Sequence, residues 1–132
     1  AHLRTSCHLL PETKQCLPNF LVIGAQKAGT TTLYNLMASH PQIVPPAKKE
    51  ALFLYSWQRK HVCDPPETRP TRQELVTYAE EAGFPRVEDM ENKSSLRITG
   101  EWSSTYFAGW CLPGAMRRVF PGLKLGMQLR DP

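Results

Sequence analysis

Residues 24–32 form a stretch whose residue types suit the binding of an anionic group. It reads Gly24-Ala25-Gln26-Lys27-Ala28-Gly29-Thr30-Thr31-Thr32. The glycines at both ends let the backbone turn tightly and approach a ligand closely. Backbone N–H groups that converge at the start of a helix attract negative charge, and threonine hydroxyls add donors without charge. We therefore predict a phosphate site made by Lys27, Ala28, Gly29, Thr30, Thr31 and Thr32.

The spacing of the two glycines matches the nucleotide-triphosphate loop G-x-x-x-x-G-K-[ST], but Thr30 replaces the lysine of that pattern. The lysine of this chain stands earlier, at Lys27, where its ammonium reaches a different part of a ligand. This difference argues against ordinary ATP or GTP hydrolysis. A P-loop kinase or NTPase stays open as an alternative. It predicts an acidic magnesium ligand at a later strand end, a condition that Asp131 meets only weakly.

Such a loop needs a strand before it and a helix after it, and the sequence predicts both. The run 20–23 is apolar without alternation, which is typical of a parallel strand buried on both faces. Apolar residues at helical spacing follow from Thr31, and Pro41 prevents the helix from continuing. Further elements are predicted as a helix over 71–82, a short strand over 97–101, a helix over 114–120 and a strand over 123–129. The expected fold class is α/β, with a P-loop-like parallel sheet flanked by helices and incomplete as it stands.

The helix over 71–82 has the clearest predicted boundaries. Thr71 can cap its first turn, and Glu74 follows three residues later as in a capping box. Gly83 is suited to end the helix, because glycine adopts the left-handed backbone conformation readily.

The last predicted strand delivers Arg130 at its carboxyl end. Open α/β sheets collect ligand-binding residues at this edge. A guanidinium there can grip two oxygens of a phosphate at once. We therefore predict Arg130 as a second anion ligand.

The composition is that of one small globular domain of 132 residues, with 41% hydrophobic and 21% charged residues. The net charge of +4 comes from 16 basic and 12 acidic residues that are mostly scattered. This balance excludes a nucleic-acid surface but suits an anionic ligand or polymer. Residues 1–18 show no sustained period and predict a linker or stem, followed by the folded domain over 19–132. No apolar run approaches the ~20 residues that cross a bilayer, so any membrane anchor is expected outside this segment.

The four cysteines stand at Cys7, Cys16, Cys63 and Cys111. They lack the C-x-x-C spacing of tetrahedral metal sites, so no metal is predicted. Disulfides in an oxidising compartment and buried free thiols both stay open. Four cysteines allow three connectivities, and the sequence does not choose among them.

Four motifs in order give the chain a resemblance to a known family. They are the loop with its flanks, Phe20 to Leu33; the pairs His40-Pro41 and Lys49-Glu50 before Phe53; the segment Gly100-Glu101-Trp102-Ser103 with Tyr106 and Phe107; and the ending Leu129-Arg130-Asp131-Pro132. In this order they resemble the sulfotransferases that use 3'-phosphoadenylyl sulfate (PAPS), specifically the membrane-anchored Golgi enzymes that modify glycosaminoglycans and other carbohydrates. The resemblance covers about residues 19–132.

The resemblance implies a sulfuryl transfer from PAPS to a hydroxyl or amine of a carbohydrate acceptor, with adenosine 3',5'-bisphosphate as product and no metal. Lys27 would meet the charge that builds on the bridging oxygen, while residues 28–32 hold the 5'-phosphate. Glu50 would be the base that removes the acceptor's proton, as in the glycosaminoglycan branch. Arg130 would bind the 3'-phosphate. The implied location is the Golgi lumen, in a type II membrane protein.

The chain departs from the family pattern at four positions near the acceptor. Leu52 and Leu54 replace a histidine and an aromatic residue of several relatives, and Trp102 and Ser104 replace a lysine and a proline of many. The acceptor is therefore the least transferable part of the resemblance. A non-catalytic relative that only binds anionic polysaccharide is a further alternative.

Histidine and tryptophan can also act in catalysis or sugar binding, but we assign no catalytic role to either residue type here. His40 stands at a helix end, where histidine more often caps carbonyl groups than does chemistry. The tryptophans can stack on sugar rings, but we expect at least one of Trp57, Trp102 and Trp110 to pack in the core.

Overall fold

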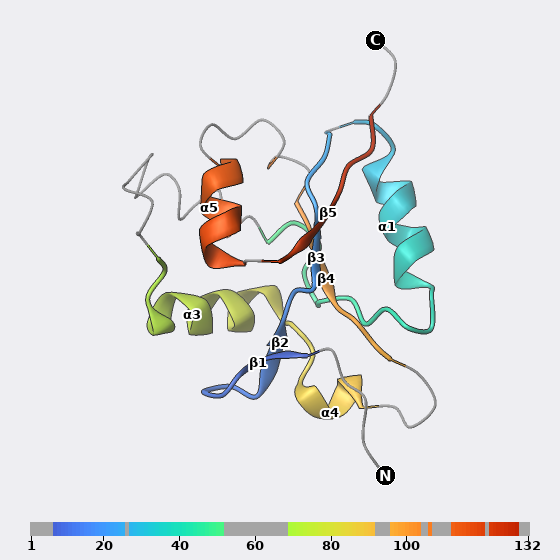
Figure 1. The fold of residues 1–132 in the computed structure, drawn as a ribbon. Helices are drawn as coiled ribbons and strands as arrows, with labels where there is room; N and C mark the ends of the chain where they lie inside the picture. Colours follow the sequence, from blue (N-terminus) through green and yellow to red (C-terminus); the bar gives the residue numbers. More distant parts are fainter. Residues whose placement is uncertain are drawn as a thin grey trace.

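The computed structural model describes residues 7–25, 27–51, 69–91, 96–103, 106, 112–120 and 122–129, without the side chains of residues 112, 115, 118 and 119. Figure 1 shows strands and helices arranged around a central sheet. The strands are β1 (His8–Leu10), β2 (Gln15–Leu17), β3 (Phe20–Val22), β4 (Gly100–Trp102) and β5 (Lys124–Gly126). The helices are α1 (Thr30–Ala38), α3 (Arg72–Ala82), α4 (Val87–Met90) and α5 (Leu112–Val119).

The central sheet has three parallel strands in the order β4-β3-β5. Phe20 of β3 lies opposite Gly100 of β4 and Lys124 of β5. All three residues of β3 are buried, as expected for an unalternating apolar run in the middle of a parallel sheet. The predicted α/β fold with a parallel sheet is confirmed.

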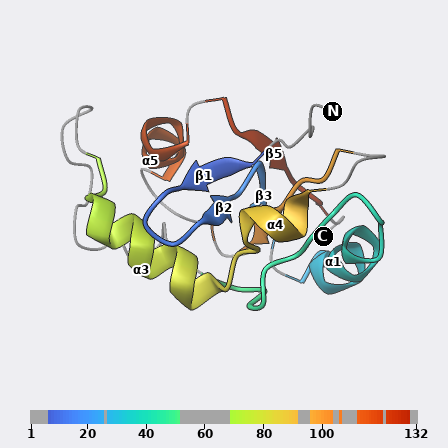
Figure 2. The ribbon, with the colours of Figure 1, turned by 90° about the horizontal axis from the view of Figure 1, so that it is seen from below.

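Alternation along β3 divides the core into two layers. Phe20 and Val22 point to one face and pack with Trp102 of β4 and with the α1 side chains Leu33, Tyr34 and Met37. Leu21 points to the other face, where it packs with residues of α3 and α5. Figures 1 and 2 show α1 on one side of the sheet and α3 with α5 on the other. The sheet is thus flanked by helices on both faces, as predicted.

The helix boundaries agree well with the capping signals in the sequence. The Thr71 hydroxyl accepts a hydrogen bond from the Glu74 backbone N–H, and the Glu74 carboxylate accepts one from the Thr71 N–H. Gly83 ends α3 in the left-handed conformation, at φ 67°. The prediction over 71–82 is confirmed at both ends, whereas the short helix α4 has no equivalent among the predicted elements.

The N-terminal segment differs from the linker expected over residues 1–18. Strands β1 and β2 form an antiparallel hairpin, and a disulfide joins Cys7 to Cys16. Leu10 and Cys16 are fully buried, and the Cys16 N–H donates to the Pro85 carbonyl oxygen. Each strand has only three residues, so its alternation is too short to show as a period in the sequence. The disulfide and the contact with the segment after α3 supply the order that local pattern does not reveal.

Candidate functional site

The loop between β3 and α1 lies at the carboxyl end of the central strand. Gly29 is the N-cap of α1 and adopts φ 81°, a left-handed conformation that favours glycine. No side chain caps this helix, and its first turn carries no acidic residue. The first N–H groups of a helix have no intrahelical acceptors. The start of α1 therefore offers donors and positive potential to an anion, as the sequence predicts.

The three threonines at this helix start differ in exposure. Thr30 is buried, whereas Thr31 and Thr32 are exposed. Ala28 is also buried, and Gly29 is exposed. The loop thus presents two hydroxyl-bearing side chains to solvent while its base is packed into the protein.

The strand next to the loop fixes its path. Beyond the ladder of β3 and β5, the Gln128 N–H donates to the Gly24 carbonyl oxygen at 2.8 Å, and the Ala25 N–H donates to the Gln128 carbonyl oxygen at 2.7 Å. A Cβ atom added at Gly29 would lie 3.0 Å from Nε2 of Gln128. The segment that leads toward Arg130 therefore runs beside the loop, although Arg130 itself lies outside the described residues.

Lys27 stands in the tight part of the loop. Its φ of 55° is positive, which is uncommon for a residue other than glycine. The next N–H, of Ala28, donates back to the Ala25 carbonyl oxygen at 3.3 Å. The side chain of Lys27 is exposed. Its position near the breaking bond stays a prediction.

The predicted base and the predicted phosphate loop meet at Lys49. The Lys49 ammonium donates to Oγ1 of Thr31 at 3.2 Å and lies 3.5 Å from Oε1 of Glu50. The same Nζ atom lies 5.9 Å from the centre of the Tyr34 ring. Lys49 thus links Glu50 to the start of α1, although Lys49 and Thr31 are eighteen residues apart in the sequence. The sequence pattern indicated Lys49 only as a partner of Glu50 and gave no sign of its contact with the loop.

Backbone contacts hold the Lys49-Glu50 segment in place. The N–H groups of Ala47 and Lys48 donate to the carbonyl oxygens of Gly83 and Ala82 at 2.9 and 3.0 Å. A Cβ atom at Gly83 would lie 2.6 Å from Cβ of Ala47, so this close approach needs the glycine that also ends α3. The end of α3 therefore positions the pair.

A buried acid lies beneath the segment. Glu101 of β4 is fully buried and accepts a hydrogen bond from the Tyr78 hydroxyl of α3. Burial raises the pKa of Glu101, hydrogen bonds from Tyr78, Ser103 and Tyr106 oppose this rise, and the charge of Glu50 adds to it. Burial, followed by the charge of Glu101, raises the pKa of Tyr78 well above its ordinary value. The Gly-Glu motif therefore supplies an acid in the core, close enough to sense the charge of Glu50.

The two residue types without a catalytic assignment have defined places. Trp102 is buried, and its ring packs edge to face against the rings of Phe20 and Tyr34, with distances between ring centres of 5.2 and 5.0 Å. This confirms that at least one tryptophan packs in the core, whereas Trp57 and Trp110 lie outside the described residues. His40 is exposed, and its Nδ1 accepts from the Gln42 N–H rather than capping a carbonyl.

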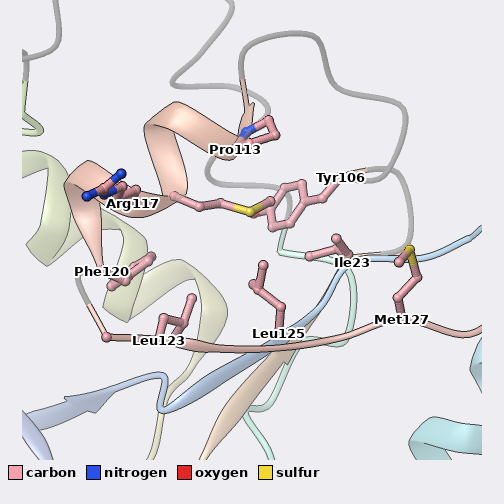
Figure 3. A pocket seen from close by; sticks show the side chains of 10 residues that line it. Ile23, Tyr106, Pro113, Arg117, Phe120, Leu123, Leu125 and Met127 are labelled. Carbon is pink, nitrogen blue, oxygen red and sulfur yellow. The ribbon is translucent and has the colours of Figure 1, made fainter.

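An apolar cavity of about 380 Å³ lies between α5 and β5. Figure 3 shows side chains from both elements pointing into it. Its lining residues are Ile23, Tyr106, Pro113, Met116, Arg117, Phe120, Gly122, Leu123, Leu125 and Met127. They include none of the loop residues 27–32, so this cavity is separate from the anion site.

Neither a metal site nor a membrane span stands out in this part of the molecule. Within the described part of the chain, no three His, Cys, Asp or Glu side chains are grouped as metal ligands would be. No described helix combines the length and apolarity that crossing a bilayer requires.

Comparison with known proteins links the chain to one group. A family model described as "Sulfotransferase family" matches residues 18–132. The chain is 32% identical over 120 residues to the membrane-associated sulfotransferase kil1 of Dictyostelium discoideum, covering 89% of this chain and 21% of that protein. It is 30% identical over 135 residues to the bifunctional heparan sulfate N-deacetylase/N-sulfotransferase of Drosophila melanogaster, covering 92% and 12%.

A solved structure shares the fold. The sulfotransferase from Alicyclobacillus acidocaldarius matches with a TM-score of 0.52 and 28% identity, over 85% of this chain and 44% of that one. The chain therefore spans less than half of this structure, and about a fifth or less of the two curated relatives.

Proposed function

The chain belongs to the sulfotransferase family, and on this premise we propose that the full-length protein transfers a sulfuryl group from PAPS to a carbohydrate hydroxyl or amine. The second product is adenosine 3',5'-bisphosphate. The acceptor class is supported by the relative whose name includes a heparan sulfate N-sulfotransferase. A glycosaminoglycan or related polysaccharide is the proposed acceptor.

One observation carries the proposal. The Glu50 carboxylate and the Thr31 hydroxyl both lie within 3.5 Å of the Lys49 ammonium, so a candidate base stands beside a candidate phosphate loop. Sulfuryl transfer needs the base close to the bound phosphate, because the acceptor oxygen attacks in line while the nucleotide phosphate departs.

Each predicted residue has a role in this reaction. The N–H groups and hydroxyls of residues 28–32 hold the 5'-phosphate at the start of α1. The Lys27 ammonium stabilises the negative charge that grows on the bridging oxygen as the S–O bond breaks. Glu50 takes the proton of the acceptor as its new bond to sulfur forms. Arg130 binds the 3'-phosphate, which distinguishes this nucleotide from ATP.

The location in the cell is also part of the proposal. We propose that the protein works in the Golgi lumen, held by an anchor outside these residues. The disulfide between Cys7 and Cys16 supports an oxidising compartment, where such bonds persist. One relative is described as membrane-associated. Immunofluorescence with a Golgi marker tests this, and staining confined to the cytosol would contradict it.

Calorimetric titration of the full-length protein tests the nucleotide. We expect adenosine 3',5'-bisphosphate to bind more tightly than ATP, without any need for magnesium. Preference for ATP with a magnesium requirement would instead support the P-loop kinase alternative.

A second experiment tests the base. Glu50→Gln should reduce sulfate transfer by about 10²–10⁴-fold, the usual contribution of a general base, while the nucleotide still binds. The exposed Glu80→Gln serves as a control for removal of one negative charge. Full transfer by Glu50→Gln would contradict the assignment.

A further inference from the structure

Lys49 contacts both the predicted phosphate loop and the predicted base. Its ammonium bridges Thr31 Oγ1, at 3.2 Å, and Glu50 Oε1, at 3.5 Å. The Tyr34 ring on α1 lies 5.9 Å from the same nitrogen, which favours a cation in this place. One positive charge therefore lies between the site for an anion and the carboxylate that must accept a proton.

The pair between Lys49 and Glu50 is suited to exchange. The two side chains are 25% and 35% exposed, and the distance of 3.5 Å is long for a charge-assisted hydrogen bond. Ion pairs of this kind contribute little to stability because water screens them. A phosphate bound at the start of α1 carries more charge and lies on the Thr31 side of the same ammonium.

The backbone around Lys49 is held in place, so only the side chain of Lys49 can move its ammonium. Ala47 and Lys48 are fixed to the end of α3, and Ala51 packs against the core cluster that contains Tyr78 and Tyr106. Lys49 lies between these anchors on a flexible side chain with a four-carbon stem. Its ammonium can shift by rotation alone between the carboxylate and the loop.

We propose that Lys49 is a nucleotide-sensing positioning residue, which pairs with Glu50 in the free protein and moves to the 5'-phosphosulfate group when the nucleotide binds. The move takes the Lys49 ammonium away from the Glu50 carboxylate when the nucleotide is bound. No bond to Lys49 forms or breaks. The acceptor's proton goes to Glu50, the acceptor oxygen or nitrogen binds sulfur, and the electron pair of the broken S–O bond stays on the departing phosphate. The inference rests on the proposed function, since it takes Glu50 as the base.

The test compares four forms of the full-length protein by titration with adenosine 3',5'-bisphosphate: wild type, Lys49→Met, Glu50→Gln and the double variant. Glu50→Gln removes the competitor for the ammonium, so its affinity should rise by about two- to fivefold over wild type. Lys49→Met should lower affinity by about tenfold, both alone and when combined with Glu50→Gln, because the ammonium contacts the bound nucleotide. A Lys49→Arg variant should recover most of the binding.

The decisive comparison is Lys49→Met in the Glu50→Gln background. If the Lys49 ammonium does not contact the bound nucleotide, removing it from a protein that lacks the Glu50 carboxylate leaves affinity unchanged, and this result would overturn the inference. Lys48→Met is the matched control, since it removes the same charge from the exposed neighbouring residue. An equal loss in the two lysine variants would indicate a general field effect and would also overturn the inference.

The outcome separates this inference from the proposed function. If wild type does not bind adenosine 3',5'-bisphosphate, the proposed function fails. If wild type binds it and transfers sulfate while the Lys49 variants behave like the Lys48 control, only the role of Lys49 fails.

Discussion

Replacing Gly29 by alanine tests whether the backbone at the start of α1 makes the anion site. Gly29 adopts φ 81°, and alanine in the left-handed region costs about 1–2 kcal/mol. The added Cβ would also lie 3.0 Å from Nε2 of Gln128, a side-chain end that can give way by a small shift. The backbone strain is therefore the main cost.

Alanine at residue 29 can avoid this strain only by turning the loop away from its observed path. A nucleotide that needs the observed path must then restore it on binding. The strain of about 1–2 kcal/mol converts to a loss of about 5- to 30-fold in affinity for adenosine 3',5'-bisphosphate, measured by calorimetric titration of the full-length protein.

Gly122→Ala is the matched control for this variant. Gly122 has nearly the same φ, 82°, and a Cβ there would meet no atom within 4 Å. It precedes β5, at the sheet edge opposite the loop. We expect it to lower the free energy of unfolding by about 1–2 kcal/mol with binding unchanged. Equal nucleotide affinity in the two variants would refute the argument that the conformation of Gly29 shapes the site.

Three further predictions concern the core and the helix caps. Burial raises the pKa of Glu101, so the contribution of this carboxyl to stability is complete below its ordinary pKa and is lost as pH rises through its pKa in the folded protein. Between about pH 5 and about pH 8, Glu101→Gln should therefore lose less unfolding free energy than wild type in urea titrations. An equal pH dependence in the two proteins would contradict this. Gly100→Ala would place a Cβ 2.3 Å from the Phe20 ring and should destabilise by about 3 kcal/mol or more, with partial recovery in a Phe20→Leu background, whereas a loss below about 1 kcal/mol would show that the ring moves freely. Thr71→Ala removes a capping box and should cost about 1 kcal/mol by thermal unfolding, while no loss would mean that solvent caps α3 equally well.

Local signals in the sequence were sufficient for the parts of the fold that depend on neighbours in the chain. Thr71, Glu74 and Gly83 predict α3 because caps act within one helical turn. The apolar run 20–23 predicts β3 because both of its faces are covered by helices. The hairpin of β1 and β2 was not predicted, because its order comes from a disulfide and from contact with residues beyond α3.

The candidate site depends more on distant contacts. The loop pattern located the start of α1, but the link from Thr31 to Lys49 exists only once the segment after α1 is fixed to the end of α3. The bond from Tyr78 to Glu101 likewise joins a helix to a strand that lies later in the chain. No periodicity encodes such pairings, and neither of the two contacts was predicted from the sequence.

The order of strands in the central sheet has a consequence for synthesis on the ribosome. β3 emerges before both of its partners, which are residues 100–102 and 124–126. At the usual pace of translation, the roughly one hundred residues between β3 and β5 take on the order of 5–20 s to appear. During that time the apolar segment 20–23 lacks its neighbours, and the long-range pairings it awaits are slow to form. The nascent chain is therefore expected to need protection by a chaperone until β5 is made.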